Sequence, residues 1–324
     1  MKIIDAHTHI YNLNGDFTPL YTLAKRLGFD RLTVLSLQCL DPLQNILCAL
    51  CKLKNPGTTY AFGGLDYQTG QDFLSQAKNL KAIGFDGIKM LEGKPTVRKM
   101  LNIALDDPVY GEYYTYLEET GFPVLFHAAD PPEFWDKAKV PGWAVKNGWF
   151  YDETFVPYEQ FYHEVENILN KHPKLKITLA HFFFLSGDPV RAQKFLDDHP
   201  SVFFDLAAGI EMYENFSSAP DFWRAFFIKN SKRIIFGTDS TDAEISSGCA
   251  EMEIKFLCSG NEIEILGKKL CGIALPEETQ ERIFSLNYQD FAGKTPAKIN
   301  RDLLLQAAAS MRAENLVEQI YNYT

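Results

Sequence analysis

Cysteine is scarce in this sequence. The 324 residues include six cysteines, too few for a disulfide scaffold in a chain of this length. Two of them, Cys48 and Cys51, have the spacing of a CxxC motif, but they fall within a stretch of helical periodicity at residues 41–54, and no second pair accompanies them. A four-sulfur metal site is therefore not predicted, and packing explains this pair better than redox or metal chemistry.

Basic residues and long apolar runs are also lacking. Lysine and arginine number 32 against 42 acidic residues, which gives a formal charge of −10 without a basic cluster. Such a chain repels phosphate backbones and anionic lipid surfaces, so we expect neither nucleic acid nor a membrane as a partner. No window approaches the roughly twenty apolar residues of a membrane helix, and Met1 leads directly into an expected strand without a secretory signal. We therefore expect a cytoplasmic protein.

The sequence also lacks internal repeats, low-complexity segments and linkers rich in proline and serine. Because 46% of its residues are apolar, it can bury one large core. We expect a single domain over residues 1–324, in which residues 298–324 form a helical extension at the carboxyl terminus.

Short runs of β-branched and other apolar residues alternate with longer amphipathic stretches, which is typical of repeated βα units around a parallel sheet. Eight runs have strand character: residues 2–6, 32–36, 60–65, 87–90, 123–126, 176–180, 202–206 and 233–237. Eight parallel strands, each followed by helical sequence, close into a barrel. The predicted fold is an α/β protein, a (β/α)8 TIM barrel with additional C-terminal helices.

Three predicted connections are longer than a barrel requires. Residues 91–108 follow the fourth strand and residues 128–157 follow the fifth, so both leave the end of the barrel where such enzymes place their active sites. We expect these two inserted loops to cover a pocket. The third connection, residues 261–275, has the pattern of a hairpin that turns at Gly267 and Lys268, before a last helix from Glu277.

Two histidines mark the end of the first predicted strand, in Asp5-Ala6-His7-Thr8-His9. Because side chains alternate along a strand, His7 and His9 point to the same side, which at this end of the strand is the mouth of the barrel. Two imidazoles so placed can share one metal ion. The pair alone is weak evidence, since nearby histidines also arise by chance or as hydrogen-bonded polar groups.

Further residues of metal-binding type follow later strands. His127 ends the fifth strand, His181 ends the sixth and Asp239 follows the eighth. Barrel enzymes draw their catalytic groups from the carboxyl ends of several strands, so these residues together predict a metal site at one rim. Asp205 ends the seventh strand and could either reach the mouth or orient one of the histidines. Structural roles are expected for the histidines within or at the ends of predicted helices, His163, His172 and His199.

In this order, the motifs resemble the amidohydrolase superfamily, and more closely its amidohydrolase-related branch, which includes the aminocarboxymuconate-semialdehyde decarboxylase-like enzymes. The resemblance extends over the whole chain. It rests on the segments Ile4-Asp5-Ala6-His7-Thr8-His9, Gly87-Ile88-Lys89, Leu179-Ala180-His181-Phe182, Ile234-Ile235-Phe236-Gly237-Thr238-Asp239-Ser240 and Glu281-Arg282-Ile283-Phe284-Ser285-Leu286-Asn287. The implied activity is metal-dependent hydrolysis or a related lyase reaction.

The resemblance implies four ligands for one divalent metal, namely His7, His9, His127 and Asp239. Zinc is the usual ion of such a site and manganese is the alternative. Three neutral imidazoles and one carboxylate suit Zn²⁺ and leave a position for water, beside which His181 would lie. Asp239 can accept the proton of that water and His181 can hydrogen-bond the substrate oxygen, so these two are the predicted catalytic residues.

Lys89 leaves the number of metals open. It lies on the fourth strand, where binuclear members of the superfamily carry a carboxylated lysine that bridges two ions. The closer branch usually uses one ion, and an unmodified Lys89 would instead attract a substrate carboxylate. Because neighbouring strand residues alternate, the side chain could also point away from the pocket. One metal is predicted, with a second metal on a carboxylated Lys89 as the alternative.

The loop after the fifth strand contributes further candidates for substrate binding: Asp130, Trp135 and Glu153. Aromatic side chains are frequent in this loop and could bind a ring or an apolar acyl group. They could equally pack against one another as a small core, which is the more common use of such residues.

Three functions remain in competition for a protein of this kind. The preferred hypothesis is hydrolysis of an amide, lactone or ester bond in a small, carboxylate-bearing molecule by a metal-activated water. The alternative is non-oxidative decarboxylation of a small unsaturated or aromatic acid, because the same branch contains both chemistries. A non-catalytic metal-binding barrel is the third, and the intact ligands at the expected strand ends argue against it. Dimers are common among the relatives, so the resemblance is also compatible with a homodimer.

Overall fold

The computed structural model describes residues 1–12, 14–207, 209–241 and 248–323. Its main sheet is parallel and curled, with the strand order β8-β7-β6-β5-β4-β3-β2-β1-β9. The strands are β1 (Ile4–His9), β2 (Arg31–Leu35), β3 (Thr59–Gly63), β4 (Gly87–Gly93), β5 (Val124–Ala128), β6 (Ile177–Leu179), β7 (Val202–Asp205), β8 (Ile234–Ile235) and β9 (Ser240–Thr241). The eight predicted strands are confirmed with small differences at their ends, and the fold is the predicted TIM barrel type.

The barrel closes through an eighth strand that is interrupted. β8 pairs with β7 and β9 pairs with β1, so the two edges of the sheet belong to neighbouring segments of the chain. Between these segments, the backbone N–H of Ala6 donates to the carbonyl oxygen of Phe236 at 3.1 Å. β8 and β9 are therefore two halves of one strand, and the gap between them contains Asp239.

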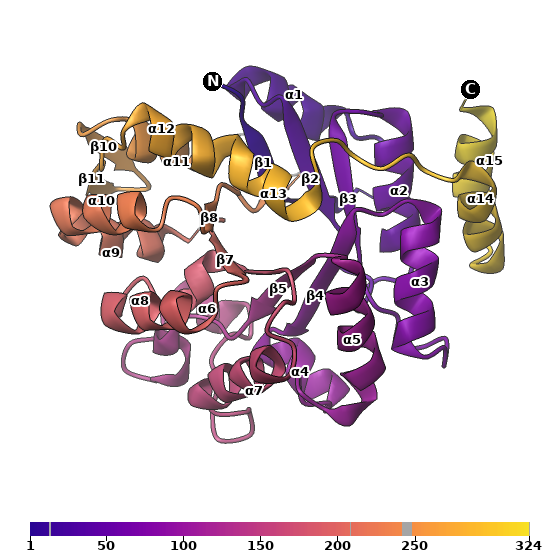
Figure 1. Cartoon of the computed structure of the whole chain (residues 1–324), viewed down its shortest axis with the longest axis horizontal. Helices are drawn as coiled ribbons and strands as arrows, with labels where there is room; N and C mark the ends of the chain where they lie inside the picture. The colour runs from indigo at the N-terminus through magenta and orange to yellow at the C-terminus, as the bar shows by residue number, and fades with distance from the viewer. Residues whose placement is uncertain (13, 208, 242–247, 324) are drawn as a thin grey trace.

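Helices surround the sheet (Figure 1). They are α1 (Thr18–Leu27), α2 (Gln44–Lys54), α3 (Phe73–Ile83), α4 (Pro95–Leu101), α5 (Gly111–Thr120), α6 (Gly142–Lys146), α7 (Tyr158–Lys171), α8 (Pro189–Asp198), α9 (Ile210–Ser218), α10 (Pro220–Lys229), α11 (Cys249–Cys258), α12 (Glu277–Glu281), α13 (Asn287–Ala292), α14 (Arg301–Ser310) and α15 (Glu314–Asn322). Short 3₁₀ helices span Pro108–Tyr110, Pro132–Trp135 and His181–Phe184, and a π-helical turn, Arg282–Leu286, joins α12 to α13. Within the described parts of the chain, no helix has both the length and the apolar character needed to cross a membrane.

The predicted hairpin is present as the antiparallel strands β10 (Glu262–Ile265) and β11 (Lys268–Cys271). Ile265 pairs with Lys268, so the turn consists of Leu266 and Gly267, one position earlier than predicted. Both residues adopt the positive φ that a two-residue hairpin turn of this type requires. The tail forms two helices, α14 and α15, which pack beside α2 and α3 at the edge of the molecule (Figure 1).

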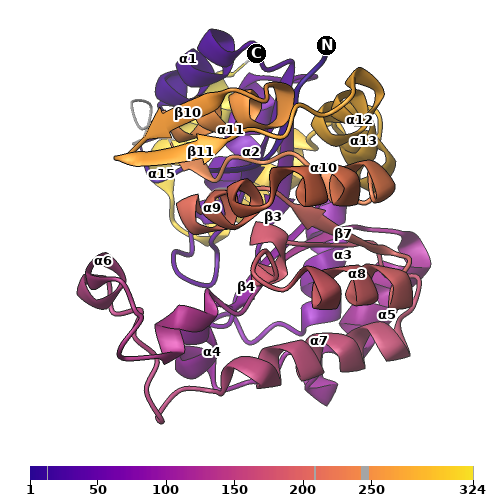
Figure 2. The ribbon, with the colours of Figure 1, turned by 90° about the vertical axis from the view of Figure 1, so that its left-hand side faces the viewer.

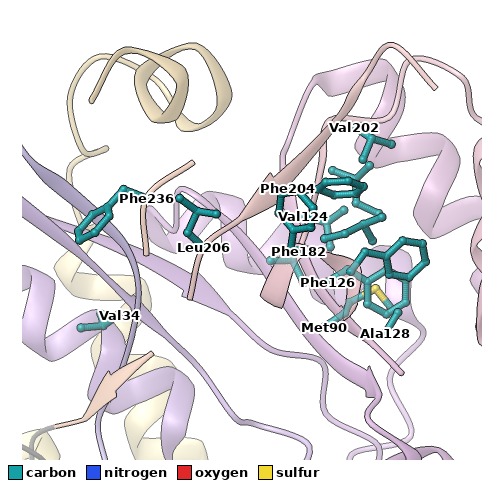
Figure 3. Packing of buried hydrophobic residues seen from close by; sticks show 14 of the residues in the cluster. Val34, Met90, Val124, Phe126, Ala128, Phe182, Val202, Phe204, Leu206 and Phe236 are labelled. Carbon is teal, nitrogen blue, oxygen red and sulfur yellow. The ribbon is translucent and has the colours of Figure 1, made fainter. Parts of the chain in front are cut away.

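Alternation along the strands separates two apolar layers. In β5, Val124 and Phe126 belong to the layer between strands and helices, part of which Figure 3 shows, whereas Leu125 belongs to a smaller layer inside the barrel. The next residue on the inner side of β5 is His127. The polar mouth of the barrel therefore begins where the inner apolar layer ends.

β1 contains an irregularity that changes which side chains face inward. Its pairing with β2 shifts between Asp5 and Thr8. Ala6 belongs to the inner apolar layer, whereas His7 and His9 contact groups at the mouth. Irregularities of this kind commonly re-aim side chains next to active sites. The shift explains how two odd-numbered histidines reach the interior from a strand in which an even-numbered residue fills the inner core.

Gly84 is expected to contribute to stability because the segment that leads to α14 packs closely against it. It ends α3 with a φ of 104°, and a Cβ placed on it would lie 2.3 Å from the carbonyl oxygen of Lys298. Gly84→Ala therefore combines a strained left-handed backbone with displacement of the passing chain, and we expect the free energy of unfolding to fall by about 2 kcal/mol. Denaturant titration measures this loss.

Gly57→Ala is the matched control for this prediction. Gly57 also has a positive φ, 82°, but no heavy atom lies within 4 Å of the position that a Cβ would occupy. This variant should show the backbone strain alone, about 1 kcal/mol. Equal losses in the two variants would contradict the importance of the contact with Lys298.

Candidate metal centre

Three side chains form a compact group at the mouth of the barrel: His7 and His9 of β1, and Asp239 from the gap between β8 and β9. Nε2 of His7 lies 3.4 Å from Oδ1 of Asp239, and Nε2 of His9 lies 3.2 Å from the same oxygen. One ligand atom from each residue lies within 4.8 Å of the others, a spacing that a single metal ion can bridge. The Asp239 side chain is 35% exposed, so the group is open to small molecules.

Hydrogen bonds of the Nδ1 atoms fix the orientation of both histidines. Nδ1 of His7 lies 2.8 Å from Oδ2 of Asp205, and Nδ1 of His9 lies 3.1 Å from the carbonyl oxygen of Leu35. A carboxylate or carbonyl oxygen accepts hydrogen bonds, so each Nδ1 carries a proton, and Nε2 is the nitrogen that faces the mouth, where the neutral ring offers a lone pair to a metal. Asp205 thus occupies the orienting position that the sequence left open, and its other oxygen accepts the backbone N–H of His181 at 2.7 Å.

The charges of the compact group suit a metal. Burial lowers the pKa of His7 well below its usual value, with a further contribution from Lys89, so the imidazole stays neutral. Burial alone would raise the pKa of Asp239, but His7 and His9 hold that pKa well below its ordinary value. A neutral imidazole and an ionised carboxylate are the protonation states in which these groups bind metals.

The other two predicted histidines lie next to this group. The ring centroid of His181 lies 5.3 Å from that of His7 and 4.9 Å from that of His127. Nδ1 of His181 faces the carbonyl oxygen of Ala207 at 3.2 Å, and Nε2 of His127 faces Oδ1 of Asp130 at 3.1 Å, so both nitrogens are donors. The opposite nitrogens, Nε2 of His181 and Nδ1 of His127, face each other at 3.2 Å.

The nitrogen lone pairs at the mouth favour a cation. Burial lowers the pKa of His127 to about 3, so its ring is neutral, and two neutral lone pairs that face each other repel unless a proton or a cation lies between them. Imidazole nitrogens together with one carboxylate fit a divalent ion such as zinc or manganese. Among the described residues, however, the compact group comprises His7, His9 and Asp239 but not His127, which lies against His181.

His181 and Asp239 share an unusual backbone. Their φ angles are 56° and 51°, and residues 181–184 all have positive φ although none is glycine. Left-handed conformation costs such residues roughly 1–2 kcal/mol each. Phe182 and Phe183 are fully buried in the outer apolar layer, which holds the turn in place. Strained backbone of this kind concentrates at functional sites.

Lys89 points into the barrel. Its Nζ lies 3.4 Å from Nε2 of His7, and the residue is 2% exposed. Burial lowers the pKa of Lys89 to about 8, while Asp205 and Asp239 act in the opposite direction. Lys89 is not among the described residues that line the cleft, so its contact with a substrate stays a prediction.

A cleft of about 680 Å³ opens at the metal group. Asp239, His127 and His181 lie at its inner end, and Trp143 and Trp149 of the loop after β5 line its outer part. The loop after β5 therefore lines the cleft, whereas Lys94 is the one described residue of the other predicted loop, residues 91–108, that does so. Figure 2 shows α6, which belongs to the loop, standing apart from the helices around the barrel.

The structure separates the three candidates from this loop. Asp130 lines the cleft, whereas Trp135 and Glu153 are not among the described residues that do. Nε1 of Trp135 donates to the carbonyl oxygen of Val156 at 3.0 Å, and its ring packs against that of Tyr151. Glu153 is exposed. Several aromatic residues of the loop pack against one another as a small core, and a substrate role for Trp135 and Glu153 stays a prediction.

Lys94 is a cleft residue that the sequence reasoning missed. It follows β4 directly and precedes Pro95 at the start of α4. Its Nζ lies 2.9 Å from Oδ2 of Asp130 and 4.2 Å from the centre of the Trp149 ring. The predicted fourth strand ended at residue 90, three residues before the end of β4, so Lys94 fell within the predicted loop at residues 91–108 and was not placed at the rim.

Comparison with solved structures gives matches to TIM barrel enzymes. A dihydroxybenzoic acid decarboxylase from a Polaromonas species, with bound manganese and the inhibitor 2-nitroresorcinol, is 13% identical with a TM-score of 0.57 and covers 90% of this chain and 96% of that chain. The 4-oxalomesaconate hydratase of Rhodopseudomonas palustris is 13% identical with a TM-score of 0.56, over 96% of this chain and 99% of that chain. A Pseudomonas putida protein, provisionally assigned as a 2-pyrone-4,6-dicarboxylic acid hydrolase, is 13% identical with a TM-score of 0.53, over 90% and 97%. At these identities the similarity shows a shared fold.

The family is shown by sequence. No curated protein sequence matches the chain. The family model described as amidohydrolase, however, matches residues 4–287, which is most of the chain and includes every residue of the site described above. The chain therefore belongs to the amidohydrolase family of metal-dependent enzymes, in the branch that its motifs predicted.

Proposed function

We propose that this protein is a metal-dependent hydrolase that acts on an amide, lactone or ester bond of a small, carboxylate-bearing molecule. The observation that carries the proposal is the convergence of imidazole lone pairs and the Asp239 carboxylate at the inner end of a cleft. Such a site suits attack of water on a carbonyl group.

In this proposal, His7, His9 and Asp239 hold one divalent metal and His127 is the adjoining fourth ligand. The nitrogen and oxygen donors support zinc, and manganese is the alternative because the decarboxylase of similar fold contains it. A divalent metal supplies Lewis acidity, which polarises a carbonyl group and makes water more acidic. Lys89 remains an unmodified amine in the proposal, so a single metal is expected.

Asp239 and His181 are the proposed catalytic residues. Asp239 is ionised and partly exposed, so its carboxylate can accept the proton of the attacking water. His181 lies at the inner end of the cleft and its Nδ1 donates to the carbonyl oxygen of Ala207, so Nε2 is the nitrogen directed at the site; when the ring is protonated, the Nε2–H group can donate to the developing oxyanion. The backbone N–H of His181 and Nδ1 of His7 both hydrogen-bond the carboxylate of Asp205, which keeps the two histidines side by side.

A substrate carboxylate is supported by two observations. The ammonium groups of Lys89 and Lys94 lie near the inner end of the cleft and offset its negative residues. The hydratase and the hydrolase of similar fold carry names of carboxylic acid substrates, 4-oxalomesaconate and 2-pyrone-4,6-dicarboxylic acid. We therefore place small unsaturated acids and their lactones first among the compounds to test.

Decarboxylation is the second candidate, favoured by the similarity to the dihydroxybenzoic acid decarboxylase. Protein loaded with zinc or with manganese should be incubated with lactones, esters and amides of small acids, and separately with aromatic and dienoic acids. Release of the product acid without CO2 supports hydrolysis, and CO2 release replaces that proposal with decarboxylation. If a broad panel yields neither product from fully metal-loaded protein, the enzymatic proposal fails.

His181→Asn should separate catalysis from metal binding. The variant removes the donor to the substrate oxygen, and we expect kcat to fall by about 10²-fold while metal content stays unchanged. Steady-state kinetics and metal analysis of the purified protein measure both. His163→Asn on α7 is the control, because His163 is exposed and lies outside the cleft lining. Loss of the metal in His181→Asn would show that His181 is a ligand and would contradict the assigned role.

A further inference from the structure

Hydrogen-bond donors of the protein contact both carboxylate oxygens of Asp130. The residue is 3% exposed. Its Oδ1 lies 3.1 Å from Nε2 of His127 and 3.2 Å from Nζ of Lys94, and its Oδ2 lies 2.9 Å from the same Nζ and accepts the hydroxyl of Tyr151. Few of its lone pairs remain for a substrate, although Asp130 lines the cleft.

Asp130 and its three donors, Lys94, His127 and Tyr151, come from separate parts of the barrel rim. Lys94 follows β4, His127 and Asp130 belong to β5 and the residues just after it, and Tyr151 belongs to the far end of the loop that covers the cleft. The loop contributes Trp149 as well, whose ring lies 4.2 Å from Nζ of Lys94. One buried carboxylate therefore joins the covering loop, the end of β4 and an imidazole of the metal centre.

This contact determines which nitrogen of His127 faces the metal centre. A carboxylate that pairs with an ammonium group and accepts a hydroxyl is an acceptor, so Nε2 of His127 must carry a proton. The lone pair of the neutral ring is then on Nδ1, which points away from Asp130 and lies 3.2 Å from Nε2 of His181. For His7 and His9 the inward nitrogen is Nε2, so His127 differs from them in its protonated nitrogen.

We propose that Asp130, supported by Lys94 and Tyr151, is a positioning residue that fixes His127 with Nε2 protonated and Nδ1 directed at the metal centre. The role in turnover rests on the proposed function, whereas the protonation of His127 does not. Asp130 therefore acts through His127 and not by binding the substrate. Partners of this kind orient a metal-binding imidazole and set its basicity, and their removal typically lowers metal affinity or activity by about 10- to 100-fold.

The protonation state can be read directly. Long-range ¹H–¹⁵N NMR spectra of the metal-free protein distinguish the two neutral tautomers of each histidine, and His127→Gln assigns the signals of this ring. We expect the Nε2–H tautomer for His127 in the unmodified protein. In Asp130→Asn, the amide oxygen should turn to Lys94 and Tyr151 and the amide nitrogen to His127, so the ring should change to the Nδ1–H tautomer. An Nδ1–H tautomer in the unmodified protein, or no change in the variant, would overturn the proposal.

Zinc affinity and kinetics test the consequence. Asp130→Asn should weaken zinc binding or lower kcat by about 10- to 100-fold and change KM by less than about threefold. Tyr151→Phe should show a smaller effect in the same direction, which keeps the test informative if Asp130→Asn fails to fold. Asp136→Asn is the matched control, since Asp136 belongs to the same loop but pairs with Lys139 at a partly exposed position.

The outcomes separate the two proposals. A raised KM with unchanged kcat, unchanged zinc affinity and an unchanged tautomer would make Asp130 a substrate-binding residue. If no hydrolytic substrate is found, the tautomer and the zinc affinity still decide the role of Asp130. If hydrolysis is found but the tautomer of His127 does not depend on Asp130, this proposal fails and the proposed function stands.

Discussion

Asp239→Asn is expected to lower kcat by about 10³- to 10⁴-fold, the largest effect of any single substitution considered for this protein. Asp239 contributes the charged ligand of the compact group, with Oδ1 within 3.4 Å of Nε2 of both His7 and His9. The same carboxylate is the proposed acceptor of the proton from water. Asparagine keeps the size and one oxygen but removes the charge and the basicity, so metal binding and proton transfer are weakened together.

Metal titration and kinetics at saturating metal distinguish these two losses. Zinc affinity should fall at least about tenfold, and the loss in kcat should remain when the site is saturated, because the amide is not a base. Asp198→Asn on α8 is the control, since Asp198 is exposed and pairs with Lys194 at the surface. Activity of Asp239→Asn within about tenfold of the unmodified protein would contradict the role of Asp239 as proton acceptor.

The positions of the strands and of the candidate metal ligands could be predicted because they depend on local sequence and on topology. A parallel barrel brings the carboxyl ends of all its strands to one rim. Once Ile177–Leu179 and Val202–Asp205 are strands, the residues that end or follow them, such as His181 and Asp205, must lie at that rim. Short continuous apolar runs between longer amphipathic stretches are sufficient to locate such strands.

Details that depend on neighbouring elements could not be predicted. The shift in β1 between Asp5 and Thr8 and the interruption between β8 and β9 arise where strands close the barrel, and no local pattern marks them. The unfavourable backbone energy of the left-handed turn at residues 181–184 is offset by burial of Phe182 and Phe183 in a core formed with distant helices. Local propensity alone would assign such residues to ordinary conformations.

Side chains in the inserted loops were the least predictable part of the site. Trp135 and Glu153 were selected for their residue type, but irregular segments have no periodicity that fixes where a side chain points. Asp130 lines the cleft, but its partners Lys94 and Tyr151 are 36 and 21 positions away in the sequence, so its contacts could not be predicted. Such contacts are visible only after the loop is placed on the barrel.

Lys52→Met is expected to lower the free energy of unfolding by about 3–5 kcal/mol at neutral pH, the largest loss of stability predicted here. Nζ of Lys52, on α2, lies 2.5 Å from Oδ2 of Asp86 and 2.7 Å from the carbonyl oxygen of Gly84, and both charged side chains are 2% exposed. Asp86 also accepts the backbone N–H groups of Ala61 and Ala297. Removing the ammonium leaves a buried carboxylate without a countercharge, which is the costly case for a buried ion pair.

The pH dependence of this loss identifies Asp86 as its cause. Burial raises the pKa of Asp86 and Lys52 lowers it, so the folded-state pKa rises further in Lys52→Met. A carboxyl whose pKa is raised by folding reduces stability above that pKa and has no such effect below its unfolded-state pKa of about 3.9. Denaturant titrations should therefore show the largest loss near neutral pH and a smaller one near about pH 4.

The double variant Lys52→Met/Asp86→Asn should recover part of the stability at neutral pH, because the amide is uncharged and still accepts one of the backbone N–H groups. Lys25→Met on α1 is the control for loss of one surface charge, since Lys25 is exposed. A loss in Lys52→Met that is the same at every pH, and that Asp86→Asn does not reduce, would attribute the effect to packing of the methylene chain. In that case the buried charge of Asp86 would not be what the ammonium of Lys52 compensates.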